Sequence, residues 1–318
     1  MKRKQRDILI TGATGFIGAN LVRHVLAAGD QPHILLRNHA HTWRIKDILP
    51  QMITHTVDMR NAKEVADVVK RVNPHRIFHL ASYGAYPFQQ EVAEMVRTDV
   101  AGTLALLEAA RQAHRLEAFI SAGSSTEYGF KDHPMRETDG LEPNTAYGAA
   151  KASQTLWSQF FAKAYGLPVV VVRPSLVYGF YEEPTRLIPS AIVSHIRNEP
   201  LSLSSPFPKK DFIFVADVLE ACDVLAENAA KHAGEIFNIA SGKEYSVGEV
   251  VMLIRRLLRR TIPFRWGGHE GRIWDTDTRW VDDVSKIKRV LGWQASHSFE
   301  GGLVKTIQWF EKHHTLYP

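Results

Sequence analysis

Apolar residues in the first half of the chain follow two alternating patterns: short continuous runs, and longer stretches with helical spacing. Short apolar runs between turn residues are typical of buried strands, and apolar residues three and four apart are typical of amphipathic helices. The short runs predict strands at residues 7–11, 33–36, 52–60, 76–80, 116–120 and 168–173. The helical spacing predicts helices at 19–28, 61–72, about 89–114 and 143–165. This alternation predicts an α/β fold with a doubly wound parallel sheet.

The pattern changes after about residue 180. We expect helices at 184–195, 215–228, 246–260 and 299–313, with extended segments at 201–204 and 262–266. The sequence therefore predicts a dinucleotide-binding domain over 1–179 and a smaller α/β substrate-binding domain over 180–318. Because the extended stretch 173–179 runs directly into the second half, we expect an interleaved boundary and no independent folding of that half.

A glycine-rich segment follows the first predicted strand and opens the first predicted helix. In this context Gly12 allows a tight turn, Gly15 lets the backbone approach a pyrophosphate, and Gly18 lets the helix pack on the sheet. The helix N-terminus then presents free N–H groups to the phosphates. We expect a dinucleotide to bind the whole segment, Gly12, Thr14, Gly15, Phe16, Ile17 and Gly18.

The second predicted strand ends at Arg37, where an acidic residue would hold the ribose 2′-hydroxyl of NAD. A guanidinium suits a 2′-phosphate instead, and Arg44 follows a few residues later. We therefore predict NADP, as NADPH, in preference to NAD. The alternative is that Arg37 stacks on the adenine or points to solvent.

Tyr147 and Lys151 are four residues apart on a predicted helix, so both side chains lie on one face. A nearby ammonium lowers the pKa of a phenol, which would prepare Tyr147 for proton transfer. Upstream, Ser124 lies in a hydroxyl-rich segment directly after a predicted strand, where open α/β sheets bind ligands. Taken alone, the Tyr-Lys spacing also fits a packed tyrosine beside an exposed lysine.

Composition narrows the classes of protein. With 39 Lys and Arg against 34 Asp and Glu, the net charge is +5, and the basic residues are mostly spread out, which does not favour a nucleic-acid patch. No apolar run is long enough to span a bilayer, and a single cysteine, Cys222, fits the reducing cytoplasm. The 15 histidines show no ligand spacing, so we expect no metal site.

These motifs together resemble the extended short-chain dehydrogenases/reductases, in particular the nucleotide-sugar epimerase, dehydratase and reductase group. The likeness continues in Phe212–Val218, Gly234–Gly242 and Leu291-Gly-Trp. The resemblance implies that Tyr147 exchanges the proton, that Lys151 holds the nicotinamide ribose, and that Ser124 is the catalytic hydroxyl. It also implies adenine contacts from Asp58 and Met59, and nicotinamide contacts near Leu80, Ala81 and Ser82.

Several positions depart from the group. Dehydratases of this group usually carry an Asp-Glu pair directly after the catalytic hydroxyl, where this chain has Ser125 and Thr126. Leu176 replaces an Asn that many epimerases use, Lys210 replaces an Arg, and Asp99 stands where Asn is frequent. The pattern is therefore closer to that of sugar-nucleotide 4-ketoreductases.

We accordingly expect NADPH-dependent reduction of a keto group, at C4, of a nucleotide-activated deoxy sugar. The alternatives are a 4-epimerase using tightly bound NAD, reduction of a non-sugar carbonyl, and a non-catalytic dinucleotide- or RNA-binding protein. Expected substrate contacts are Tyr83, Ser125, Thr126, Arg186, Lys210, Arg272 and Arg279. The resemblance also implies a homodimer formed through the two long helices.

Overall fold

The computed structural model describes residues 4–267 and 279–317. Its strands are β1 (Asp7–Thr11), β2 (Gln31–Leu36), β3 (Ile53–Thr56), β4 (Arg76–His79), β5 (Ala118–Ala122), β6 (Val169–Pro174), β7 (Leu176–Tyr178), β8 (Leu201–Leu203), β9 (Lys209–Phe214), β10 (Ile236–Ile239), β11 (Glu244–Ser246), β12 (Phe264–Trp266) and β13 (Arg279–Trp280). Its α-helices are α1 (Phe16–Ala27), α2 (Ala62–Val72), α3 (Val92–Met95), α4 (Gly102–Ala110), α5 (Ala146–Tyr165), α6 (Leu187–Arg197), α7 (Val215–Glu227), α8 (Val247–Leu258), α9 (Ser285–Leu291) and α10 (Phe299–His313). The other helical segments are the π-helix η2 (Val96–Ala101) and the 3₁₀ turns η1 (Leu49–Gln51), η3 (Ser125–Glu127) and η5 (His314–Leu316).

The chain forms two compact, interleaved units. Unit 1 comprises residues 1–129, 137–174 and 219–238, and unit 2 comprises 130–136, 175–218 and 239–318. The units therefore cannot be separated at one position between residues 179 and 180. That one unit binds the dinucleotide and the other the substrate stays a prediction. Within the described ranges, none of the helices is both long and apolar enough to cross a membrane.

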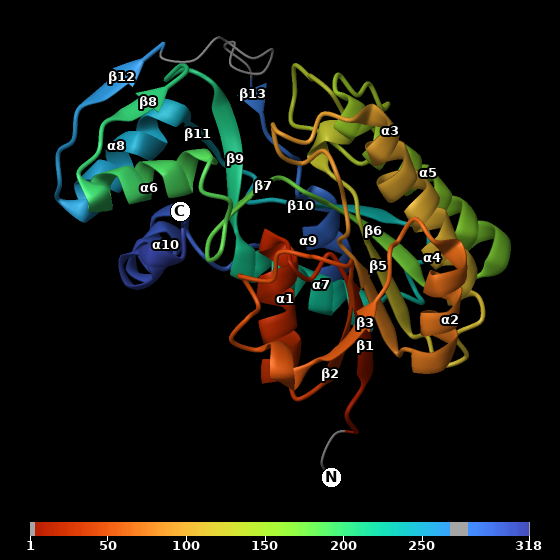
Figure 1. Ribbon diagram of the computed structural model, residues 1–318. Helices are drawn as coiled ribbons and strands as arrows, with labels where there is room; N and C mark the ends of the chain where they lie inside the picture. Colours follow the sequence, from red (N-terminus) through yellow and green to blue (C-terminus); the bar gives the residue numbers. More distant parts are fainter. Residues whose placement is uncertain (1–3, 268–278, 318) are drawn as a thin grey trace. The chain divides into compact units, whose positions relative to one another are not determined.

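Unit 1 is built on a seven-stranded sheet in the order β10-β6-β5-β4-β1-β2-β3 (Figure 1). The five neighbouring pairs from β6 to β3 are parallel. The chain runs outward from β1 in one direction through β2 and β3, and in the other through β4, β5 and β6. The switch point between β1 and β4 is where ligands bind in doubly wound sheets. The predicted fold class is confirmed.

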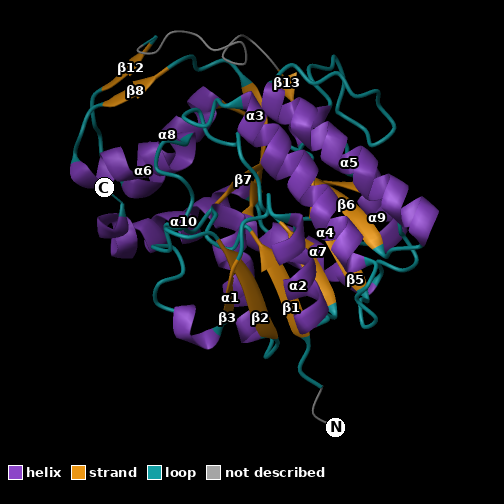
Figure 2. Cartoon of the chain, turned by 45° about the vertical axis from the view of Figure 1, so that its right-hand side comes forward, coloured by secondary structure: helices purple, strands orange, loops and turns teal. Residues whose placement is uncertain are grey.

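Helices cover both faces of this sheet, as Figures 1 and 2 show, with α1 on one face and α2, α4 and α5 on the other. The second face buries a continuous apolar cluster contributed by the strands and by α2, α4 and α5. Local signals define the helix ends. The Asn61 side chain accepts the Glu64 N–H at the start of α2, and Thr145 accepts the Gly148 N–H at the start of α5. Gly166 ends α5 at φ +67°, a conformation that favours glycine.

Unit 2 contains a sheet in the order β11-β9-β13, with β7 also paired to β9, and a two-stranded pair of β12 and β8. In the second half of the chain, helices α6, α7, α8 and α10 and strands β8 and β12 agree with predicted segments, and β7 lies within the extended stretch expected at 173–179. Helix α9 and strands β9, β10, β11 and β13 were not predicted. These strands are two to six residues long. Runs so short carry too few alternating positions to be recognised by pattern.

Two predictions in the first half are corrected. The segment expected to be one helix over 89–114 is α3, the π-helix η2 and α4, ending at Ala110. Sequence periodicity cannot reveal a π-helical turn, which adds one residue to the helical repeat. The strand expected over 52–60 ends at Thr56, so Asp58 and Met59 follow the strand as a loop.

Candidate functional site

The glycine segment forms a tight turn between β1 and α1. Gly12 has φ +71°, and a Cβ there would lie 2.6 Å from the backbone nitrogen of Ala81, which follows β4. A Cβ on Gly18 would lie 2.1 Å from the carbonyl oxygen of Gly12. On Gly15, the N-cap of α1, a Cβ would meet only the Gly12 oxygen among the described residues, at 3.2 Å. Gly12 and Gly18 therefore permit close packing, whereas Gly15 leaves the start of α1 bare, as a bound pyrophosphate requires.

A chain of hydrogen bonds joins this turn to the end of β4 and continues to Thr103 on α4. Thr11 accepts the N–H groups of Leu80 and Ala81, and its hydroxyl contacts Nδ1 of His79 at 2.8 Å. Nε2 of His79 lies 2.8 Å from the hydroxyl of Thr103. Burial, then the charge of Lys151, lowers the pKa of His79 to about 3, so the ring is neutral. The residues predicted at the nicotinamide end, Leu80 and Ala81, are thus held against the glycine turn.

Ser124 caps the short turn η3 after β5. Its Oγ accepts the Thr126 N–H at 3.2 Å and the Thr126 hydroxyl at 2.8 Å. In return, the Glu127 carboxylate accepts the Ser124 N–H at 2.8 Å. Both bonds to Oγ use its lone pairs, so the hydroxyl proton of Ser124 is available for another acceptor. The side chain of Ser125, which lies between Ser124 and Thr126 in the sequence, is buried.

A buried ion pair supports this turn. Both side chains, Glu127 and Arg173 on β6, have at most 1% exposure. Two guanidinium nitrogens of Arg173 lie 2.7 and 2.9 Å from the same Glu127 oxygen. The other oxygen accepts from Thr155 on α5 at 3.0 Å. Strand, turn and helix are thereby locked together beneath Ser124.

The first turns of α5 carry Tyr147 and Lys151 against this segment. A Cβ on Gly148 would lie 2.6 Å from the Thr126 carbonyl oxygen, so glycine lets the helix approach the Ser124 turn beside Tyr147. Lys151 is buried and donates to Gln154 Oε1 at 2.8 Å. Burial lowers the pKa of Lys151, and the charges of Asp99 and Glu127 oppose that shift.

Asp99 lies in the π-helix η2 with no exposed surface. It accepts the Tyr83 N–H at 2.9 Å and contacts the Ser82 hydroxyl at 3.4 Å. Burial raises its pKa to about 6, and the charge of Lys151 acts in the opposite direction. Two loop residues predicted to contact ligands, Ser82 and Tyr83, are therefore held by a carboxylate that also interacts with Lys151.

The ends of β2 and β3 form a polar pocket of about 420 Å³. It is lined by Arg37, Asn38, His39, Ala40, His41, Thr56, Val57, Asp58, Arg60 and Glu64. Arg60 donates to both oxygens of Asp58, and this ion pair lowers the pKa of Asp58. Arg37 is exposed on the rim beside it.

Arg44 and Met59, which were also predicted to contact the dinucleotide, do not line this pocket. Arg44 is buried, donates to the Thr14 carbonyl at 3.4 Å and stacks on Trp43 with its Cζ 4.4 Å from the ring centre. It therefore braces the glycine turn and does not line the pocket that holds Arg37. Met59 is buried in the core beneath Gly102 of α4.

Three predicted substrate contacts lie in unit 2. Arg186 is the exposed N-cap of α6, and Lys210 lies on β9 with its ammonium 5.6 Å from the centre of the Trp280 ring. Arg279 forms an ion pair with Glu244. Arg272 lies outside the described residues.

Within unit 1, Ser124 begins η3 at the carboxyl end of β5, and α5, whose first turns carry Tyr147 and Lys151, packs against η3. The roles of Glu127, Gln154 and Arg60 were not predicted. Gln154 offered a local signal, because it is three residues after Lys151 on a helix, and Arg60 is two residues after Asp58. Glu127 follows Ser124 at the spacing of a capping box, but nothing local indicated its ion pair with Arg173, 46 residues away.

Residues 8–240 match the model of the family described as "NAD dependent epimerase/dehydratase family". The chain is 30% identical to dTDP-glucose 4,6-dehydratase of Neisseria meningitidis serogroup B, covering 96% of this chain and 93% of that protein. Among solved structures, it resembles dTDP-glucose 4,6-dehydratase of Bacillus anthracis in complex with NAD (TM-score 0.85, 28% identity, 98% of each chain). It also resembles UDP-glucose 4-epimerase of Thermotoga maritima with UDP-glucose (TM-score 0.86, 25% identity, 97% and 99% covered). The chain therefore belongs to the NAD dependent epimerase/dehydratase family and is an enzyme of the extended short-chain dehydrogenase/reductase type.

Proposed function

We propose that the protein reduces a keto group, at C4, of a nucleotide-diphosphate deoxy sugar with NADPH. The observation that carries this proposal is the packed set in unit 1: a hydroxyl with a proton to donate, a tyrosine one helical turn before a buried lysine, and a glycine turn with an open helix end. Similarity to a dehydratase and an epimerase of nucleotide-linked sugars supports the substrate class.

The residues fit a bound dinucleotide. The bare start of α1 at Gly15 would hold its pyrophosphate, and Lys151 its nicotinamide ribose. A bound dihydronicotinamide supplies the hydride that reduces the keto carbon. Ser124 would donate a hydrogen bond to the keto oxygen, and Tyr147 would give that oxygen its proton, which yields the alcohol. The positive charge of Lys151 stabilises the tyrosinate that remains until solvent returns a proton.

Water elimination fits these residues poorly. A dehydratase needs an acid and a base close to the catalytic hydroxyl, and here Ser125 and Thr126 occupy the next two positions. Ser125 is buried, and the Thr126 hydroxyl is bonded to Ser124. Neither group titrates near neutral pH, so the similarity to dehydratases supports the substrate class and not the elimination step.

We propose NADPH as the preferred dinucleotide. Arg37, His39 and His41 line the pocket at the ends of β2 and β3, and Arg37 comes directly after β2, where a 2′-phosphate would lie. The Asp58 carboxylate is already bound by Arg60, which limits its capacity to hold a ribose hydroxyl. Replacement of Arg37 by Ser should weaken NADPH binding roughly tenfold or more and leave NADH binding nearly unchanged, as measured by calorimetry.

The function is tested by incubating the purified protein with NADPH and 4-keto-6-deoxy sugars linked to dTDP, UDP, GDP or CDP. The expected result is oxidation of one NADPH per sugar reduced, with the product alcohol identified by NMR. If the protein instead carries bound NAD and interconverts two sugar nucleotides without added NADPH, it is an epimerase. A Tyr147→Phe variant that keeps full turnover would exclude the assigned proton donor.

We also propose that two copies associate through α5 and the segment of α3 and η2. Exposed apolar residues follow these elements: Val92, Val96, Leu156, Trp157, Phe160 and Tyr165. Large exposed apolar patches typically mark interfaces. Sedimentation should give a dimer for the parent protein and a monomer for Trp157→Glu, whereas a parent that sediments as a monomer would exclude this assembly.

A further inference from the structure

The ammonium of Lys151 is held by an amide from its own helix. Lys151 Nζ lies 2.8 Å from Gln154 Oε1, and both side chains are buried. Because a lysine only donates, the amide oxygen of Gln154 must face it, which directs the amide NH₂ the other way. An ammonium carries three N–H groups, and Gln154 takes one of them.

The other end of the amide is anchored in β5. Gln154 Nε2 donates to Ser121 Oγ at 3.0 Å and to the Ala122 carbonyl at 3.3 Å. Ser158, one turn later on α5, donates to the same Ser121 oxygen at 3.0 Å. The orientation of Gln154 is therefore determined at both ends, and the position of Lys151 Nζ relative to β5 follows from it.

The charge of Lys151 has a separate support. Asp99 lies in η2, which packs against α5, and its side chain has no exposed surface. Its charge raises the pKa of Lys151, against the effect of burial. The charge of Glu127 on η3 also raises the pKa of Lys151. The charge of Lys151 in turn lowers the pKa of His79 on β4, which is neutral. Tyr147 lies one turn before Lys151 on α5. Of the two carboxylates, Glu127 is already committed to Arg173 in a buried ion pair.

We propose that Gln154 and Asp99 are positioning residues for Lys151: the Gln154 amide holds the ammonium in place, and the buried Asp99 carboxylate, on the turn packed against α5, supplies its counter-charge. This inference rests on the proposed function only in that Lys151 serves Tyr147 and the dinucleotide there. It adds that the neutral Gln154 amide fixes the position of the ammonium and that the buried Asp99 carboxylate balances its charge.

Four variants of the full-length protein separate the tasks. Gln154→Met keeps the volume and removes the acceptor, Gln154→Glu keeps the acceptor and adds a charge, and Asp99→Asn removes the charge but still accepts the Tyr83 N–H. Ser158→Ala is the matched control, because it removes a buried bond to the same Ser121 without touching Lys151. The Lys151 titration is followed by NMR of lysine-labelled protein and assigned with Lys151→Met, and NADPH binding is measured by calorimetry between pH 6 and 9.

We expect the Lys151 titration to move to lower pH in Asp99→Asn and Gln154→Met, to move to higher pH in Gln154→Glu, and to stay unchanged in Ser158→Ala. NADPH should bind roughly tenfold more weakly to Gln154→Met, as the loss of one charged hydrogen bond implies. Titrations of Asp99→Asn and Gln154→Glu that coincide with the parent overturn the inference, and these two decide it even if Gln154→Met does not fold. The titration needs no turnover, so it stands or fails separately from the proposed reaction.

Discussion

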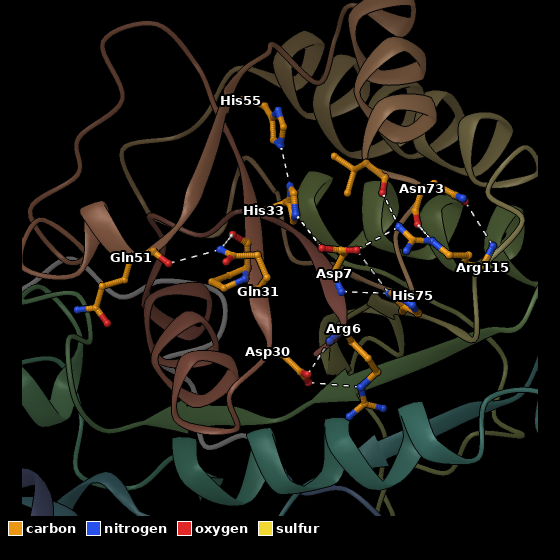
Figure 3. Close-up of polar contacts among 12 residues, drawn as sticks. Arg6, Asp7, Asp30, Gln31, His33, Gln51, His55, Asn73, His75 and Arg115 are labelled. Carbon is orange, nitrogen blue, oxygen red and sulfur yellow. Dashed lines mark hydrogen bonds and ion pairs between the residues drawn. The ribbon is translucent and has the colours of Figure 1, made fainter. Parts of the chain in front are cut away.

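The two edges of the sheet in unit 1 are both rich in polar side chains, but they use them differently. At the amino edge, shown in Figure 3, Asp7 at the start of β1 donates its N–H to His75 Nδ1 at 3.0 Å. Its carboxylate accepts from Arg115 at 3.1 Å and lies 3.3 Å from His33 Nε2. Arg115 also donates to the Asn73 carbonyl. These groups satisfy one another and the backbone at the strand starts.

At the carboxyl edge, the hydrogen bonding is equally dense, but Ser124 and Lys151 keep donors that can bind a ligand. Ser124 uses its lone pairs on Thr126 and keeps its proton, and Lys151 gives one of three N–H groups to Gln154. A cluster of buried polar residues therefore does not by itself mark a ligand site. The better criterion is the donors that remain after the internal bonds are counted.

The largest effect should come from Tyr147→Phe. The variant keeps the packing of α5 and loses the phenolic proton, so kcat for the proposed reduction should fall by about 10²–10⁴-fold, with NADPH affinity nearly unchanged. Tyr165→Phe, at the exposed end of the same helix, is the control and should keep parental turnover.

The buried ion pair beneath Ser124 should dominate stability. Arg173→Met leaves Glu127 charged and buried, so the free energy of unfolding should fall by about 3–5 kcal/mol, as measured by urea denaturation. The double variant with Glu127→Leu should recover part of this loss, because no unpaired charge remains. A single variant as stable as the parent would mean that the pair does not hold the turn.

A smaller, pH-dependent effect is expected at His55 on β3, which contacts His33 in the network of Figure 3. His55 Nε2 lies 3.1 Å from His33 Nδ1 with the rings stacked, and burial, then the charge of His33, lowers the pKa of His55 to about 4. The unfolded chain, with an imidazole pKa near 6.5, therefore takes up this proton first as the pH falls. This stability is present above about pH 6.5 and is lost progressively toward pH 4.

Replacement of His55 by Gln tests this effect. Between pH 7 and 4.5 the variant should lose about 1 kcal/mol less unfolding free energy than the parent, after allowance for solvent screening. The exposed His114→Gln serves as control. If the unfolding free energies of the parent and of His55→Gln fall equally with pH, the histidine pair does not contribute to acid sensitivity.

The smallest effect should come from the exposed pair of Arg115 and Asp7, whose side chains are 41% and 32% exposed. A double-mutant cycle with Arg115→Ala and Asp7→Asn should give a coupling of at most about 1 kcal/mol, decreasing with salt. A coupling as large as that of Arg173 and Glu127 would contradict the distinction between the two edges.

Features that depend on neighbours along the chain could be predicted from the sequence alone. The order of strands and helices in unit 1 follows from apolar periodicity, and the glycine turn follows from its place between a strand and a helix. The stacking of Tyr147 and Lys151 follows from the helical repeat, because four residues make about one turn. None of these requires knowledge of which strands become neighbours.

The surroundings of those residues, in contrast, depend on how the chain packs in three dimensions. Glu127 meets Arg173 because β5 and β6 are adjacent, Gln154 meets Ser121 because α5 packs on β5, and Arg44 reaches Thr14 across 30 residues of chain. The π-helical turn that places Asp99 in the core left no periodic signal. The physical reason is that burial and pairing of charges depend on sheet order and close packing, whereas periodicity records only which face of its own element a residue occupies.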